Sequence, residues 1–267
     1  MRLRLLLSLP FFIALLGLQQ IPEPKPDELV RRALANQHSM NELLSKYSYA
    51  KRIVSVSSNA HGKVTAREDR VYNYAPCGTK TCIALVSVNG APPKPKELKE
   101  HEKAVQKEQE KAAKKSAADR KKEEDEDLFL NKDFLTVYDF SSPGTELLKG
   151  TASVVVEFAP KPETVALAAK SDKILTKLAG RMWIAEVDGK IVATEMHMVK
   201  PIKVWGGFAG AIKNMVVQQE YLVDAEGTYL PKKNAMEMEL RVLLNTMQLS
   251  IVEEYSDFKR AAAGGAQ

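Results

Sequence analysis

The sequence predicts an α+β protein built on one strongly curved antiparallel sheet, whose concave side is covered by helices. From Gly180 onward almost every segment alternates apolar and polar residues, as strands do. Amphipathic helical spacing occurs in two stretches, 27–46 and 166–178, and no strand–helix–parallel-strand repeat is found. A sheet of about six or more strands has to curl, and its inner side then needs a filling.

The chain of 267 residues, 45% of them hydrophobic, is long enough for a packed core. Residues 1–20 are expected to be a signal peptide, because Arg2 and Arg4 precede an apolar run that is shorter than a membrane span of about 20 residues. Cleavage is expected between Gly17 and Gln20, with an uncleaved anchor as the alternative. A single domain is expected over 21–260, with a charged helical insertion at 96–127 and a disordered tail at 261–267.

The two cysteines, Cys77 and Cys82, are predicted to form a disulfide, because an exported chain meets an oxidising compartment. Strand-like sequence flanks them, so the bond would clamp the end of a hairpin. A redox site would need a Cys-x-x-Cys spacing, and a metal site would need further cysteine or histidine ligands nearby. The sequence has neither, and we expect no metal and no cofactor.

The N-terminal half reads as a helix followed by a meander of strands. Asp27 can cap the helix, and strands are expected at 47–57, 63–74 and 83–88. In the second strand Glu68 and Arg70 share a face with Tyr72 and Tyr74. This arrangement allows an ion pair at the mouth of a cavity, and the alternative is a solvated strand surface.

The insertion at 96–127 is predicted to be a long helix, because it is composed mostly of strong helix formers. Its lysines could contact an anionic membrane surface or an acidic partner, and the alternative is a solvated helix. The net charge of +5 is spread along the chain, so nucleic acid is not an expected partner. The lysines that recur at every fourth position are Lys99, Lys103, Lys107, Lys111 and Lys115.

Alternation in the C-terminal strands predicts one dry face. Met236, Met238 and Leu240 point one way, while Glu237 and Glu239 point the other. If the helices fill the concave side only partly, an apolar cavity remains, and methionine suits it because its side chain reshapes easily. The alternative is an ordinary core under well-docked helices. The candidate ligand-binding residues are Trp183, Val192, Met196, Met198, Met215, Val217, Tyr221, Met236, Met238 and Leu240.

The sequence offers no candidate catalytic residue. The histidines lack metal-binding spacing, and the glycine-rich stretch 206–210 lacks the continuation that phosphate-binding loops have. His197 lies between Met196 and Met198, a combination that copper can use, but alternation places the histidine on the opposite face. An enzyme is therefore not expected.

Two segments carry a family resemblance: "LAGRMWIAEVDGKIVATE" at 178–195 and "VVQQEYLVDAEGTYLPKK" at 216–233. With the alternating strand that follows, they resemble the LolA/LolB-like family of outer-membrane lipoprotein-sorting and related periplasmic proteins, over roughly 145–258. The resemblance implies a half-barrel, that is, an unclosed β-barrel, with a hydrophobic cavity for acyl chains, opened by helix movement and free of covalent chemistry. The charged insertion at 96–127 departs from the compact carrier pattern.

The expected function is that of a periplasmic binding protein, soluble after signal cleavage. It would hold a lipid or the acyl chains of a lipoprotein, in outer-membrane lipoprotein sorting or lipid transport. The alternative is a periplasmic interaction or sensor protein of the envelope-stress type, which would use the same half-barrel and the charged helix.

Overall fold

The computed structural model describes residues 25–77, 80–114, 134–162, 176–204, 210–243 and 245–261. The expected signal peptide, the insertion from residue 115 onward, most of the helix predicted at 166–178 and the tail from residue 262 lie outside these residues. The described helices are α1 (Pro26–Leu44), α2 (Pro95–Lys114) and α4 (Phe134–Val137). The strands are β1 (Tyr47–Asn59), β2 (Val64–Cys77), β3 (Lys80–Val88), β4 (Tyr138–Leu148), β5 (Thr151–Pro160), β6 (Leu178–Ala185), β7 (Ile191–Met198), β8 (Ile202–Val204), β9 (Gly210–Val223), β10 (Tyr229–Val242) and β11 (Asn245–Arg260).

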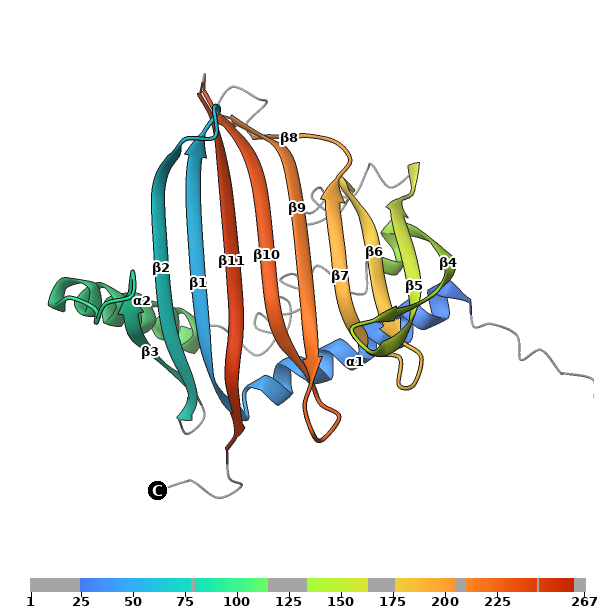
Figure 1. Cartoon of the computed structure of the whole chain (residues 1–267), viewed down its shortest axis with the longest axis horizontal. Coiled ribbons are helices and arrows are strands. Elements are labelled where there is room, and N and C mark those ends of the chain that lie inside the picture. Colours follow the sequence, from blue (N-terminus) through green and yellow to red (C-terminus); the bar gives the residue numbers. More distant parts are fainter. Residues whose placement is uncertain are drawn as a thin grey trace, which may run out of the picture.

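All these strands form one eleven-stranded antiparallel sheet (Figure 1). The strand order is β3-β2-β1-β11-β10-β9-β7-β6-β5-β4, and β8 pairs with β9 beside this path. The last strand therefore lies in the middle of the sheet, where β11 joins β1 in a long register that includes Lys51 opposite Tyr255. The predicted antiparallel sheet with few helices is confirmed.

The sheet is open, and it is not strongly curled. Among the described strands, β3 and β4 form the two edges and do not pair with each other. The broad middle of the sheet, from β2 to β9, bends only gently (Figure 1). The strong curl expected from the number of strands is therefore wrong, and α1 lies across the lower part of an open sheet (Figure 1).

One face of the sheet packs against α1, and we call it the helix face. The apolar side of α1, formed by Leu29, Val30, Ala33 and Leu34, is at most 6% exposed. Each valine or leucine side chain of this kind contributes about 1.5–3 kcal/mol when it is fully buried. The cluster that these residues join comprises Phe134, Val137, Tyr138, Val156, Phe158, Leu178, Met182, Ile184, Ile191, Met196, Met215 and Val217.

The opposite face, the outer face, carries a smaller apolar cluster around Trp183. Val155 and Trp183 are paired neighbours that alternate with Val156 and Met182 of the helix-face cluster, so they point to the other side. The indole N–H of Trp183 donates to Glu146 at 2.9 Å. The guanidinium of Arg181 lies 4.8 Å from the centre of the tryptophan ring system.

Two features fix the β2–β3 edge of the sheet. Cys77 and Cys82 form the predicted disulfide across the hairpin. Helix α2 lies beside β3 (Figure 1), where His101 Nε2 is 3.0 Å from the carbonyl oxygen of Ile83. Within the described part of the chain, no helix combines the length and the apolar character that crossing a membrane requires.

Strand β10 runs through Pro231 as one element, Tyr229–Val242. Its register against β9 shifts between Pro231 and Lys233, after which the pairing continues. Proline is tolerated in a sheet at such an irregularity because no ladder hydrogen bond is demanded from its nitrogen. The long strand carries the alternating methionines without a break.

Candidate functional site

The helix face carries a continuous band of apolar side chains across β9, β10 and β11. In antiparallel strands, residues directly opposite each other point to the same face. Met236 lies opposite Val217 and Ile251, and Met238 lies opposite Met215 and Leu249. One step further, Leu240 lies opposite Ile212 and Met247. We call this set the apolar strip: Ile212, Met215, Val217, Met236, Met238, Leu240, Met247, Leu249 and Ile251.

The apolar strip is only partly covered. Met215 and Val217 are 5% and 7% exposed and belong to the cluster that packs against α1. Ile212, Met236 and Met238 pack against that cluster but are only partly buried. Leu240, Met247, Leu249 and Ile251 are also half-buried. The apolar strip therefore extends beyond Met215 and Val217, the two members that are buried in the α1 cluster.

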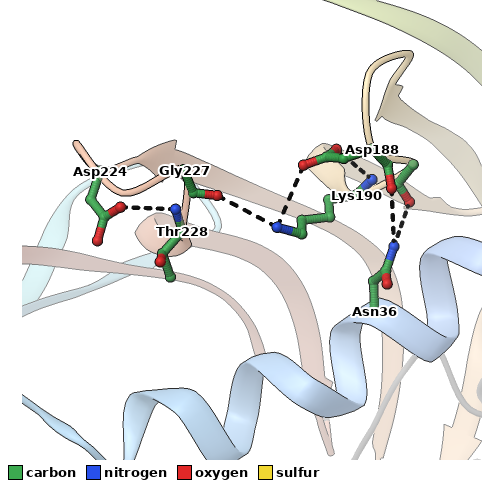
Figure 2. Close-up of polar contacts among 7 residues, drawn as sticks. Asn36, Asp188, Lys190, Asp224, Gly227 and Thr228 are labelled. Atoms are coloured by element: carbon green, nitrogen blue, oxygen red, sulfur yellow. Dashed lines mark hydrogen bonds and ion pairs between the residues drawn. The ribbon is translucent and has the colours of Figure 1, made fainter.

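Polar contacts tie α1 to the turn between β6 and β7 (Figure 2). The Asn36 side-chain amide donates to the carbonyl oxygens of Asp188 and Gly189, each at 3.3 Å. Gly189 has a φ of 70°, and a Cβ at this position would collide with Arg32 Nε of α1. The Asp188–Gly189 turn therefore lies directly against α1.

The same turn is joined to the turn between β9 and β10. Lys190 Nζ lies 3.5 Å from Asp188 Oδ2 and 3.5 Å from the carbonyl oxygen of Gly227 (Figure 2). In the second turn, the backbone N–H of Thr228 donates to Asp224 Oδ1 at 2.8 Å. These turn contacts are separate from the hydrogen bonds of the sheet ladder.

A second group of side chains on the helix face is polar and aromatic. It is built on β10, β11, β1 and β2, and its centre is Glu253. Lys51 Nζ lies 2.8 Å from Glu253 Oε1, and the Tyr255 hydroxyl donates to Glu253 Oε2 at 2.8 Å. The Asn234 amide donates to the same carboxylate at 3.3 Å. We call the set Tyr49, Lys51, Glu68, Arg70, Tyr72, Tyr74, Asn234, Glu253 and Tyr255 the polar–aromatic cluster.

Burial and pairing set the ionisation of this cluster. Desolvation alone would raise the pKa of Glu253, but the bonds and charge of Lys51, with the Tyr255 and Asn234 donors, outweigh it and lower the pKa below its ordinary value. Burial, helped by the nearby Glu253 carboxylate, raises the pKa of the Tyr255 hydroxyl. Burial and the neighbouring Tyr74 raise the pKa of Tyr49 to about 12. At neutral pH Glu253 is therefore charged, and these tyrosines are neutral donors.

Glu68 and Arg70 of β2 form an ion pair, one of the two alternatives that the sequence left open for them. Arg70 Nη2 lies 2.6 Å from Glu68 Oε1. In the described residues, Arg70 Nε is one of two buried side-chain polar atoms without a hydrogen-bond partner, the other being Thr194 Oγ1. A buried donor left unsatisfied costs about 1–3 kcal/mol. The Arg70 guanidinium also hydrogen-bonds Tyr72, and its Nε–H is the donor that is left without an acceptor.

Most of the predicted ligand-binding residues share the helix face. Met196, Met215 and Val217 belong to the α1 cluster, Met198, Met236, Met238 and Tyr221 pack against it, and Leu240 is a register neighbour of Ile212. Trp183 and Val192 lie instead in the outer-face cluster, which Tyr221 also touches. Val192 lies on the outer face because of a β-bulge. Ala193 pairs with Trp183 and Ile191 pairs with Ile184, so Val192 is an extra residue that reverses the alternation of β7.

Sequence reasoning missed the pair of Lys51 and Glu253. The two residues come from strands at opposite ends of the chain, and the pairing of β1 with β11 has no local signal. A signal did exist in β11, where Glu253 is in phase with Leu249, Ile251 and Tyr255. A carboxylate that points to the same face as apolar residues is partly desolvated, so it requires a cation or hydrogen-bond donors on that face.

The remaining polar residues of interest include His197 on the outer face. Among the residues that the structure describes, no group of three or more histidine, cysteine or acidic side chains could hold a metal ion. His197 is exposed, and it lines an outer-face cavity of about 520 Å³ with Asp139, Glu157, Arg181 and Glu195. Arg181 and Glu195 form an ion pair at 3.3 Å in this open, polar depression.

Comparison with solved structures returns the group that the sequence resembles. A LolA superfamily protein from Nitrosomonas europaea matches with a TM-score of 0.34 and 10% identity, over 89% of this chain and 94% of that one. A domain assigned to outer membrane lipoprotein sorting from Vibrio parahaemolyticus matches with a TM-score of 0.37 and 12% identity, over 89% and 95%. The MucA/MucB complex of Pseudomonas aeruginosa matches with a TM-score of 0.25 and 8% identity, over 89% and 99%.

No family model matches the chain, and no curated protein does either. The chain thus matches solved LolA-superfamily and lipoprotein-sorting structures over most of its length at low sequence identity. Matches at this identity do not identify a ligand for this chain. A ligand is therefore inferred below from the chain's own residues.

Proposed function

We propose that the protein is a binding protein that holds an apolar chain, from a lipid or from the acyl chains of a lipoprotein, against the helix face. The observation that carries this proposal is the apolar strip, which is half-buried and continuous with the core beneath α1. A surface of this kind is costly to leave beside water, and it gains stability when a ligand covers it. Holding the chain requires no chemical step.

The composition of the strip favours a hydrocarbon without a fixed shape. Met215, Met236, Met238 and Met247 are unbranched, and their side chains can repack around chains that differ in length or unsaturation. Burial contributes about 0.8 kcal/mol per CH₂ group, so about ten groups suffice for micromolar affinity. Little polar recognition is needed for the chain itself.

Movement of α1 would open the site further. The helix is held by one apolar side and by the contacts of Asn36 at the β6–β7 turn. In the proposed loaded form, α1 shifts toward that turn and the sheet curls around the ligand as an unclosed half-barrel. The ligand then replaces part of the apolar contact that α1 gives up.

We place this function in the periplasm. The proposal combines an expected signal peptide at 1–20, a single LolA-like half-barrel domain at 21–260 and a disulfide between Cys77 and Cys82. A disulfide persists in such an oxidising compartment. The charged insertion at 96–127 is an addition to this domain.

The experiment measures binding of a fluorescent polyene fatty acid. Wild-type protein is expected to bind it with micromolar affinity, and Met238→Glu is expected to weaken binding at least about tenfold, because a carboxylate on the strip would be desolvated by the chain. Val216→Glu is the matched control, since Val216 lies opposite Glu237 on the outer face of the same strand pair. Equal affinities in all three proteins, or no binding by wild type, would contradict the proposal.

A second candidate function is favoured by the position of α2. This helix lies beside edge strand β3 (Figure 1), and apart from a few positions its residues are exposed, including Lys99, Lys103, Lys107 and Lys111. An interaction or sensor protein could use it to contact an anionic membrane surface or an acidic partner. Lys115, the fifth lysine of the series, lies outside the described residues.

Vesicle sedimentation tests this second candidate. If α2 binds anionic lipid, changing the four described lysines to glutamine should release the protein from anionic vesicles, and salt should do the same. Uptake of the fatty acid should be unchanged in this variant. Sedimentation that does not depend on the lysines would exclude α2 as the contact.

A further inference from the structure

The helix face changes character along the length of the same strands. Along β11 the helix-facing residues are first Met247, Leu249 and Ile251, and then Glu253 and Tyr255. On β10 the order is Leu240, Met238 and Met236, followed by Asn234. At about 3.4 Å per residue, the face passes from hydrocarbon to hydrogen-bonding groups within about 20 Å. The apolar strip and the polar–aromatic cluster are two ends of one surface.

The formal charges of the polar–aromatic cluster cancel. Lys51 is paired with Glu253, and Arg70 is paired with Glu68, so two positive and two negative groups face one another. An additional charged group would be left without a counter-charge in a partly desolvated place. A ligand group that binds there without displacing these pairs has to be uncharged.

The cluster nevertheless has unused hydrogen-bonding capacity. Arg70 Nε is buried and makes no hydrogen bond, although the Arg70 side chain as a whole is 37% exposed. An N–H group in this position needs an oxygen acceptor such as an ester carbonyl or a hydroxyl. The ligand that supplies it must reach Arg70 from the helix face.

The aromatic rings lie beyond Glu253, at the end of the cluster that is farther from the apolar strip. Tyr49 and Tyr74 are stacked with their centres 4.7 Å apart, and Tyr255 lies 6.0 Å from Tyr49. Across the cluster, the His101 ring of α2 lies 5.5 Å from Tyr72 and bounds it on the β3 side. A tyrosine hydroxyl can donate and accept a hydrogen bond, so these rings can contact a polar head group.

We infer that the polar–aromatic cluster is the head-group end of the proposed binding site, and that it selects an amphiphile with an uncharged, ester-bearing head of the acylglycerol class. This inference rests on the proposed function. The ester or hydroxyl oxygen of the head accepts the Arg70 Nε hydrogen bond, and the hydrocarbon chain runs along the apolar strip toward Leu240 and Met247. The paired charges stay in place and disfavour a charged head.

The test compares three probes of equal chain length on the full-length protein by equilibrium titration: a monoacylglycerol, the fatty acid and the alkyltrimethylammonium ion. The monoacylglycerol is expected to bind about tenfold more tightly than either charged probe, the size of effect that one charge-assisted hydrogen bond gives. The substitution Arg70→Lys keeps the positive charge beside Glu68 but removes the Nε–H group that donates to the head group. It should remove this preference while leaving the affinity for the charged probes unchanged.

The control and the wild-type ranking keep the outcomes separate. Arg67→Lys is the matched control, because Arg67 lies opposite Val56 in the register and points to the outer face. If wild type binds all three probes equally or prefers a charged one, the head-group assignment is overturned and the proposed function stands. If wild type binds none of them, both are overturned. The wild-type ranking decides the question even where Arg70→Lys does not fold.

Discussion

The helix face has a part that α1 covers and a part, the apolar strip, that is only partly covered. Both parts carry methionines, but these methionines have different roles. Under α1, Met182 and Met196 are 0% and 1% exposed, whereas Met236 and Met238, in the same alternating pattern on β10, are only partly buried. Alternation decides the face to which a side chain points, but the docking of a helix decides whether that side chain becomes core. The difference separates a part that holds the fold together from a part that is open to a ligand.

The largest effect is expected where α1 seats on the sheet. Val30 is 0% exposed, so Val30→Asp would bury an unpaired carboxylate and should lower the free energy of unfolding by about 3–5 kcal/mol or prevent folding. Ala35→Asp places an aspartate on the exposed side of α1 and should change the free energy of unfolding by less than about 0.5 kcal/mol. Chemical denaturation measures both variants. Similar losses in the two would show that α1 is not seated as described.

A pair of methionine truncations compares the two halves directly. Met182→Ala leaves a cavity in the α1 cluster and should cost about 2–5 kcal/mol in the free energy of unfolding. Met238→Ala removes a half-buried side chain from the apolar strip and should cost clearly less, while weakening uptake of the acyl probe. Denaturation and binding titrations give both quantities. Equal stability losses would remove the distinction between core and strip.

Acid should weaken the polar–aromatic cluster. The pKa of Glu253 is lowered in the folded protein, so its contribution to stability is present above the unfolded pKa and is lost as the pH falls through the folded value. Glu253→Gln should therefore be less stable than wild type at pH 7, and the difference should shrink below about pH 4.5. Glu254→Gln, on the exposed side of the same strand, is the control. A difference that stays constant from pH 7 to pH 3 would contradict the assignment.

The smallest effect is expected at Thr194. Its hydroxyl oxygen is buried without a hydrogen-bond partner, on a residue that lies opposite Met182 in the α1-covered half. Thr194→Val keeps the shape and removes the unsatisfied group, and should raise the free energy of unfolding by about 1 kcal/mol. Thermal unfolding detects a change of this size. A loss of stability would mean that the hydroxyl has a partner in solution.

The sequence predicted the strands and most of the face assignments, because alternation is a local property. The alternation of Met236, Met238 and Leu240 placed those residues on the helix face without knowledge of their neighbours. Val192 was misplaced because a bulge reverses alternation and leaves no mark in the sequence. The contact between Lys51 and Glu253 could not be predicted, since it depends on which distant strands pair. The curl of the sheet was overestimated, because alternation shows which residues share a face but does not show how far the sheet bends.

The most direct measurement is photo-crosslinking with a long-chain acyl probe that carries a diazirine at the end of its chain, followed by peptide mapping. The account predicts labelling of helix-face residues of β10 and β11, such as Met238 and Leu249, and loss of this labelling in Met238→Glu. Labelling confined to outer-face positions such as Val216 and Glu237, or no labelling above background, would contradict the claim that the helix face holds an apolar chain.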